Sequence, residues 1–202
     1  NTSGPLGQGH TFAAGAAVAE KYLEAHLGHE VMQHKIYAFI SDGGIQEEIS
    51  QGTGRLAGVL GLNNLIMFYD ANDIQLSTPT ADVTSEDTAL KYKAWNWNVL
   101  EIDGNNPEQI RKALKAANEE TTRPTLIIGH TIMGKGARKA DGESFERDCG
   151  THGAPLGGNA YVETIKNLGA DPEDPFHIFP EVAEMYKEHL SELTKDVEKI
   201  RQ

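Results

Sequence analysis

The chain has 202 residues and a formal net charge of −12, and 39% of its residues are hydrophobic and 24% charged. This balance is typical of a globular domain and excludes the compositions of disordered and collagen-like chains. The acidic charge argues against nucleic acid as a partner, because phosphate backbones attract basic surfaces. No apolar run approaches the roughly 18 residues that predict a membrane-spanning helix, so we expect no membrane partner either.

The first half of the chain predicts helices that alternate with short buried strands. Residues 11–27 are alanine-rich with apolar positions at helical spacing, and Gly28 follows where a helix is expected to end. Apolar runs at 36–40 and 65–69 predict two strands, since each is short, continuous and closed by turn residues. The segment between them, 45–60, has the pattern of one helix.

The alternation continues into the second half. We predict a helix over 85–95, with a Ser/Thr-x-x-Asp/Glu cap at its start, followed by a strand at 99–102. Asn106 and Pro107 then open a helix that runs to 118, because proline is favoured in the first turn. The apolar run 124–129 predicts a fourth strand, and a glycine-rich loop of mixed charge follows at 133–153.

This order predicts an α/β fold with a parallel β-sheet flanked by helices, because parallel strands need crossover connections that pack on both faces. From Pro180 the pattern changes to a charge-rich C-terminal amphipathic helix, with apolar residues at Val182, Met185, Tyr186, Leu190 and Leu193. We therefore divide the chain into an α/β domain at 1–178 and a helical tail at 179–202.

Two oxygen-bearing side chains follow the first two predicted strands. Asp42 lies just past the first and Asn72 just past the second. Because parallel strands deliver their carboxyl ends to one edge of a sheet, both side chains reach one place if these strands are neighbours. A carboxylate, an amide oxygen and a backbone carbonyl suit Mg²⁺ completed by phosphate oxygens and water. Gly43 and Gly44 would let the backbone approach those phosphates, in front of a helix N-terminus.

Three segments carry a resemblance to a known family. Residues 41–74 (SDGGIQEEISQGTGRLAGVLGLNNLIMFYDANDI) resemble the thiamine-diphosphate motif, a Gly-Asp-Gly followed after a crossover by an asparagine. Residues 4–9 (GPLGQG) and 150–156 (GTHGAPL) resemble segments of transketolases and stand in the transketolase order. The resemblance covers the chain to about residue 168 and implies the thiamine-diphosphate-binding fold. Ser41 replaces the first glycine of the motif, a change between two small residues.

The resemblance also implies roles for individual residues. Asp42, Asn72 and the Ile74 carbonyl would bind a divalent metal, Mg²⁺ or Ca²⁺ or Mn²⁺ in its place. His152 would lie near the diphosphate and the substrate, and Glu47 would join two active sites across a dimer interface, which makes these two the candidate catalytic residues. Contacts to thiamine diphosphate would come from Gly4, Leu6, Gly43, Gly44, Asn72, Ile74, Leu76, Ile132 and His152.

The resemblance predicts the diphosphate-binding half of a transketolase, an enzyme that transfers a two-carbon ketol unit from a ketose phosphate to an aldose phosphate. Its partners would be sugar-phosphate substrates, a pyrimidine-binding domain of the same or a second subunit, and a second copy in a homodimer. The chain alone lacks the activating glutamate of that other domain, so we expect it to be inactive by itself.

Three other interpretations stay open. The chain could be the N-terminal subunit of a split transketolase, another thiamine-diphosphate enzyme such as a deoxyxylulose-phosphate synthase, or a non-catalytic domain that binds phosphate as a scaffold. The single cysteine, Cys149, excludes a disulfide within the chain and is typical of a reducing compartment, so we expect a cytoplasmic protein.

Overall fold

The computed structural model describes residues 2–201, and of Ile200 only the backbone. It groups the chain into two compact units. One runs from the N-terminus to Lys135 and includes Glu146–Pro155, and the other consists of Gly136–Phe145 and the residues from Leu156 onward. The boundary between 178 and 179 stays a prediction.

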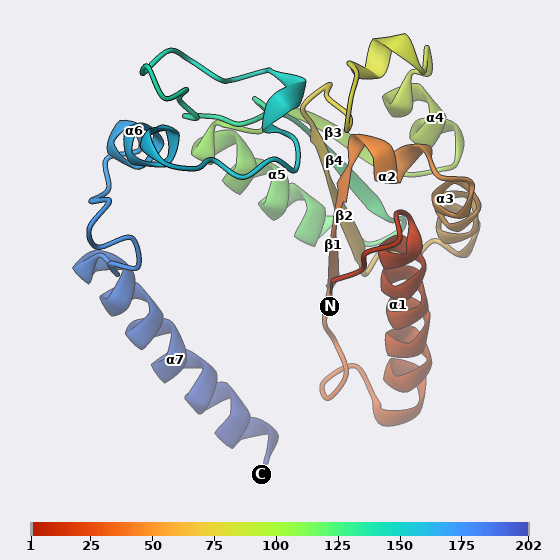
Figure 1. Cartoon of the computed structure of the whole chain (residues 1–202). Helices are drawn as coiled ribbons and strands as arrows, with labels where there is room; N and C mark the ends of the chain where they lie inside the picture. The colour runs from red at the N-terminus through yellow and green to blue at the C-terminus, as the bar shows by residue number, and fades with distance from the viewer. Residues whose placement is uncertain (1, 202) are drawn as a thin grey trace. The chain divides into compact units, whose positions relative to one another are not determined.

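The first unit is built on a parallel sheet of four strands, in the order β1-β2-β4-β3 (Figure 1). The strands are β1 (Ile36–Ser41), β2 (Leu65–Ala71), β3 (Asn98–Asp103) and β4 (Thr125–His130). The central strands β2 and β4 are almost entirely buried, which explains their continuous apolar sequences. The predicted α/β fold with a parallel sheet is confirmed, and so is the adjacency of the first two strands.

Helices cover both faces of this sheet (Figure 1). On one face, α1 (Gln8–Leu27), α3 (Glu48–Leu60) and α4 (Thr88–Ala94) pack with Leu65 and Met67 of β2. On the other, α5 (Pro107–Glu119) packs with Ile66 and with Ile127 of β4. Successive β2 side chains thus enter opposite cores, as the two-residue period of a strand requires.

The predicted helix over 45–60 is wrong as a single element. The segment is divided between α2 (Asp42–Gln46) and α3. Glu47 separates these two helices and has extended backbone angles (φ −62°, ψ 137°). Two side chains bond back to carbonyls of α2. The Ser50 hydroxyl donates at 2.6 Å to the Gly44 carbonyl, which also accepts from the Glu47 N–H at 3.4 Å, and the Gln51 amide donates to the Ile45 carbonyl at 2.9 Å. This local competition, which apolar periodicity does not register, ends the first helix early.

Two further helices differ from expectation. The predicted helix at 85–95 begins at Thr88, and its cap is Asp87, whose carboxylate accepts from the Leu90 amide at 2.8 Å. The sequence reading missed α6 (Asn159–Asn167), a short helix preceded by two glycines. The C-terminal helix is confirmed as α7 (Pro180–Ile200). Short 3₁₀ turns lie at Thr80–Asp82 and Cys149–Thr151. Across residues 2–201, helices of membrane-spanning length and apolarity are absent.

A close contact fixes α3 against the turn that follows α4. A Cβ atom added to Gly58 would lie 1.7 Å from the Trp95 carbonyl oxygen, a backbone atom that cannot rotate away. The Trp97 indole N–H donates to the Gly54 carbonyl at 2.8 Å in the same contact. Only glycine therefore lets these two backbones approach so closely.

Gly58→Ala should lower the free energy of unfolding by about 3 kcal/mol, because the added methyl forces the helix and the turn apart. Gly52→Ala is the matched control: it lies on the same helix, nothing lies within 4 Å of its added Cβ, and alanine should stabilise the helix by about 0.5–1 kcal/mol. Urea unfolding followed by tryptophan fluorescence measures both. Equal stabilities of the two variants would contradict the contact.

Candidate functional site

The two oxygen-bearing side chains predicted at the strand ends do lie together. Asp42, 1% exposed, accepts a hydrogen bond from the Asn72 backbone N–H to Oδ2 at 3.1 Å. The Asn72 Oδ1 in turn accepts from the Ile74 N–H at 3.1 Å. The structure therefore brings the three predicted metal-ligating residues into one hydrogen-bonded group at the carboxyl ends of β1 and β2.

Tyr69, near the end of β2, is part of the same group, and the sequence reading missed it. Its hydroxyl donates to Asp42 Oδ1 at 2.6 Å. Burial raises the pKa of Asp42, although the hydrogen bonds from Tyr69 and Asn72 oppose that rise. Burial also raises the pKa of Tyr69, so the phenol stays a donor at neutral pH. The sequence signal for this role is a tyrosine two residues before the end of β2, on the strand face that packs against the helices.

The donor set fits a divalent cation. A carboxylate has about four acceptor positions and an amide oxygen two, so Asp42 and Asn72 keep free lone pairs after the bonds described above. Carboxylate, amide and carbonyl oxygens are the ligands that Mg²⁺ and Ca²⁺ prefer. Within residues 2–201, no cluster of three or more His, Cys, Asp or Glu residues could form a metal site. The group thus suits a cation whose coordination is completed by a phosphate-bearing ligand and water.

The segment 4–9 packs against the turn that follows β1. A Cβ on Gly43 would lie 3.3 Å from Leu6 Cδ1. Gly7 has a positive φ of 79°, and a Cβ there would lie 2.6 Å from Ile49 Cγ2 and 3.0 Å from Glu47 Cβ. This glycine is therefore required both by its backbone angle and by the close approach.

A chain of polar contacts links α1, through α3, to the turn that follows β1. The Ser50 hydroxyl donates to the Gly44 carbonyl, and His10 Nδ1 lies 2.7 Å from the Ser50 oxygen. Since the only Ser50 hydroxyl proton is used, His10 must donate through Nδ1–H. Burial lowers the pKa of His10 to about 4, so the ring is neutral at pH 7. The sequence reading gave His10 no role, because no spacing rule links it to Ser50.

His152 lies in a loop that packs against the segment following β4. A Cβ on Gly134 would lie 3.0 Å from the Thr151 hydroxyl oxygen, and the Arg147 N–H donates to the Met133 carbonyl at 2.9 Å. The Nδ1 atom of His152 is buried and has no hydrogen-bond partner in the structure. An unpartnered buried nitrogen is costly, so this ring is suited to meet a polar ligand atom.

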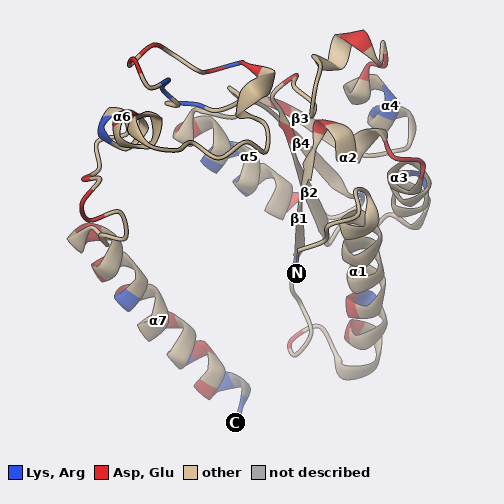
Figure 2. Ribbon diagram, in the orientation of Figure 1, with Lys and Arg blue, Asp and Glu red and all other residues tan. Residues whose placement is uncertain are grey.

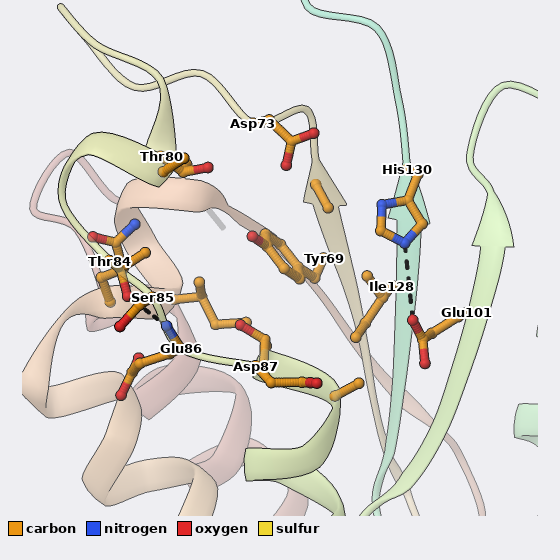
Figure 3. Close-up of a pocket in the computed structure, with 16 residues that line it drawn as sticks. Tyr69, Asp73, Thr80, Thr84, Ser85, Glu86, Asp87, Glu101, Ile128 and His130 are labelled. Atoms are coloured by element: carbon orange, nitrogen blue, oxygen red, sulfur yellow. Dashed lines mark hydrogen bonds and ion pairs between the residues drawn. The ribbon is translucent and has the colours of Figure 1, made fainter.

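Two cavities open at the carboxyl ends of the strands. The first, of about 380 Å³, is lined by Tyr69 and by the acidic residues Asp73, Glu86, Asp87 and Glu101, with His130 4.0 Å from Glu101 (Figure 3). The second, of about 700 Å³, is lined by Ile132, Lys135 and Arg147 among others. Asp73, Glu101 and Asp103 line the second cavity as well, so its two basic side chains lie among three carboxylates, whereas the first cavity has no Lys or Arg in its described lining.

The remaining predicted residues lie in different surroundings. Ile74 is buried, whereas Leu76 is 73% exposed. Gly4 is exposed with open space around it, and Glu47 is exposed at the break between α2 and α3. The structure thus gathers Asp42, Asn72 and Ile74 tightly, places Leu6 on Gly43, and leaves Leu76, Gly4 and Glu47 open to further partners.

A parallel sheet with a buried carboxylate, an amide oxygen and glycine-rich backbone at its carboxyl edge defines an α/β domain that binds its ligand at the strand ends. A family model described as the thiamine diphosphate binding domain of transketolase matches residues 1–201. Transketolase 1 of Pasteurella multocida is 44% identical over 185 residues, which cover 88% of this chain and 27% of the relative. The chain therefore belongs to the transketolase family, as its thiamine-diphosphate-binding domain.

Solved structures agree with this assignment. Transketolase of Campylobacter jejuni matches with a TM-score of 0.85 at 34% identity, over 98% of this chain and 31% of that one. Transketolase of Pichia stipitis, solved as a complex with sedoheptulose-7-phosphate, matches with a TM-score of 0.90 at 31% identity, over 99% of this chain and 29% of that one. The chain spans less than a third of the length of each of these relatives.

Proposed function

We propose that this chain is the diphosphate-binding half of a transketolase and holds thiamine diphosphate through Mg²⁺, or through Ca²⁺ or Mn²⁺ in its place. The observation that carries the proposal is the contact between Asp42 and Asn72 at the ends of two adjacent strands. In an acidic chain of net charge −12, a diphosphate needs a local cation, and these oxygens suit one. Asp42 and Asn72 would bind it through their side chains and Ile74 through its carbonyl.

The other residues would hold and orient the cofactor. Gly43 and Gly44 present backbone without side chains to the diphosphate, and the neighbouring segment contributes Gly4 and Leu6. Ile74, Leu76 and Ile132 would supply apolar contacts to the rings. When bound, thiamine diphosphate supplies the reactive carbon that carries a two-carbon ketol unit from a ketose phosphate to an aldose phosphate. The protein then positions the groups and moves protons around it.

The partners follow from the same proposal. The complex of the Pichia stipitis relative with sedoheptulose-7-phosphate supports sugar phosphates as substrates. A pyrimidine-binding domain would cover the cofactor from the other side, in the same chain or in the second subunit of a homodimer. The exposure of Glu47 supports its placement at such an interface. We further propose that the enzyme acts in the cytoplasm.

Calorimetric titration of residues 1–202 with thiamine diphosphate, with and without Mg²⁺, tests the binding function. We expect saturable binding in the presence of Mg²⁺ and strongly weakened binding when EDTA removes it. Thiamine without phosphates is the control and should not bind measurably, because the proposed anchor is the diphosphate. Equal binding with and without a divalent cation would overturn the metal-bridged site.

His152→Ala in the full-length enzyme should lower kcat by about 10² to 10⁴, because loss of one positioned proton-transfer group typically has this effect. The melting temperature should change little, since the Nδ1 atom has no protein partner to lose. His177→Ala is the control: this histidine is exposed and pairs with Asp174. Steady-state kinetics on both variants provides the measurement, and normal turnover of His152→Ala would return that residue to an ordinary loop position.

A further inference from the structure

Two neutral donors hold the Asp42 carboxylate, one on each oxygen. The Tyr69 hydroxyl donates to Oδ1 at 2.6 Å, and the Asn72 N–H donates to Oδ2 at 3.1 Å. The terminal torsion of an aspartate side chain is broad when nothing restrains it. A donor on each oxygen restrains this rotation, so the two hydrogen bonds together fix the plane of the carboxylate.

The helix that carries Asp42 is too weak to fix this side chain alone. Asp42 is the first residue of α2, which has only five residues, two of them glycines. A helix of this length is marginal, and glycine weakens it further. The extended backbone at Glu47 then separates α2 from α3. The orientation of the carboxylate therefore depends on its hydrogen-bond partners.

Both of these partners belong to the sheet. Tyr69 lies in β2, in register with Ile40 of β1, and Asn72 directly follows the last residue of β2. Strand β2 is paired on both sides, with β1 and with β4. The Tyr69 side chain is buried in the core between the sheet and the helices, so packing holds its ring in place. The hydroxyl thus ties the carboxylate of a weak helix to a central strand.

The carboxylate also keeps its charge in this arrangement. The strands and α2 contain acidic residues but no Lys or Arg (Figure 2). Within residues 2–201, the ion pairs do not include Asp42. A phenol orients a carboxylate without neutralising it, whereas a Lys or Arg in its place would repel a metal cation.

We propose that Tyr69 is a positioning residue of the metal site, and that its hydroxyl holds the Asp42 carboxylate in the orientation in which it binds the cation. The inference rests on the proposed function, to which the cation and the diphosphate belong. Hydrogen-bond partners of metal ligands orient those ligands, and the loss of one partner typically lowers metal affinity about 10- to 100-fold.

Tyr69→Phe tests this role, because it removes the hydroxyl and keeps the ring. Mg²⁺ is titrated into residues 1–202 at a fixed concentration of thiamine diphosphate, and cofactor binding is followed by calorimetry. The Mg²⁺ concentration for half-maximal binding should rise about 10- to 100-fold. Higher Mg²⁺ should then restore binding, since the Asp42 ligand is still present.

Tyr92→Phe is the matched control. Tyr92 is a buried tyrosine of the same core, and its hydroxyl has no hydrogen-bond partner among residues 2–201. Its variant should therefore need the same Mg²⁺ concentration as the wild type. An equal shift in Tyr92→Phe and Tyr69→Phe would show a general effect on the core and would overturn the positioning role.

Melting temperatures separate positioning from a purely structural role. They are measured in EDTA and with Mg²⁺ and cofactor, and the rise caused by the ligands should shrink in Tyr69→Phe, because that rise reports affinity. A hydroxyl that only stabilises the core would lower both temperatures alike and leave the Mg²⁺ requirement unchanged. That result, in a wild type that needs Mg²⁺, would overturn the role of Tyr69 alone. Cofactor binding by the wild type without Mg²⁺ would overturn the proposed metal site and this role with it.

Discussion

Asp42→Ala should weaken the Mg²⁺-dependent binding of thiamine diphosphate about 10³-fold, a loss near 4 kcal/mol. Asp42 is the one carboxylate in the group formed with Asn72 and Ile74. Without it the cation loses its anionic ligand, and the diphosphate meets an acidic domain with less charge to neutralise it. Isothermal titration with cofactor at saturating Mg²⁺ measures the change.

The controls separate a lost ligand from lost charge or lost structure. Asp73→Asn removes the same charge next to Asn72, and asparagine tolerates the positive φ of 64° at that position. Its affinity should change only a few-fold, because Asp73 is exposed and outside the group. Asn72→Ala should weaken binding in the same direction as Asp42→Ala. Wild-type affinity of Asp42→Ala, with a normal melting curve, would remove Asp42 from the metal site.

The pH dependence of binding has a definite sign. Burial raises the pKa of Asp42, so the unliganded folded state binds a proton there more readily than the unfolded chain does. A cation needs the ionised carboxylate and competes with that proton. The rise in melting temperature caused by Mg²⁺ and cofactor should therefore shrink as the pH falls toward the raised pKa of Asp42, beginning above the pH range of an ordinary aspartate. Asp42→Ala should lack this dependence.

Much of the fold follows from the sequence because its signals are local. The apolar runs of β2 and β4 and the Asn106-Pro107 helix start depend on residues close together in the chain, and the structure confirms them. The break in the helix around Glu47 was not predicted. Hydrogen bonds from the Ser50 and Gln51 side chains to carbonyls of α2 stabilise it. Periodicity records which positions are apolar and carries no information on such bonds.

Part of the candidate site could also be predicted from the sequence, and part could not. The meeting of Asp42 and Asn72 was predictable, since adjacent parallel strands end at one edge. The third member, Tyr69, was not, because nothing in a buried strand distinguishes a tyrosine that packs from one that also donates to a carboxylate. His10 was missed for a similar reason: its partner Ser50 is 40 residues away, and only the tertiary fold brings them together.

Residues 1–202 should fold and bind cofactor yet show no ketol transfer alone. In the proposed site, the group at Asp42 would anchor only the diphosphate end of thiamine diphosphate, whereas activation of the other end needs an acid placed against the aminopyrimidine ring. Glu47, the acidic residue that the family resemblance singles out, is exposed at the break between α2 and α3. The chain also spans only 27% of its Pasteurella multocida relative. We therefore expect the activating carboxylate to lie in another domain.

The assay is ketol transfer from a ketose phosphate to an aldose phosphate, with Mg²⁺ and thiamine diphosphate present, first on residues 1–202 alone. The remaining domains of a transketolase are then supplied in trans. Activity should appear only on complementation, and complementation with Asp42→Ala should restore none, because the cofactor would no longer be anchored. Turnover by the chain alone would show that it contains its own activating acid and would overturn the half-site model. Restoration by Asp42→Ala would show instead that the other domains anchor the cofactor, which would leave the group at the ends of β1 and β2 without the role assigned to it.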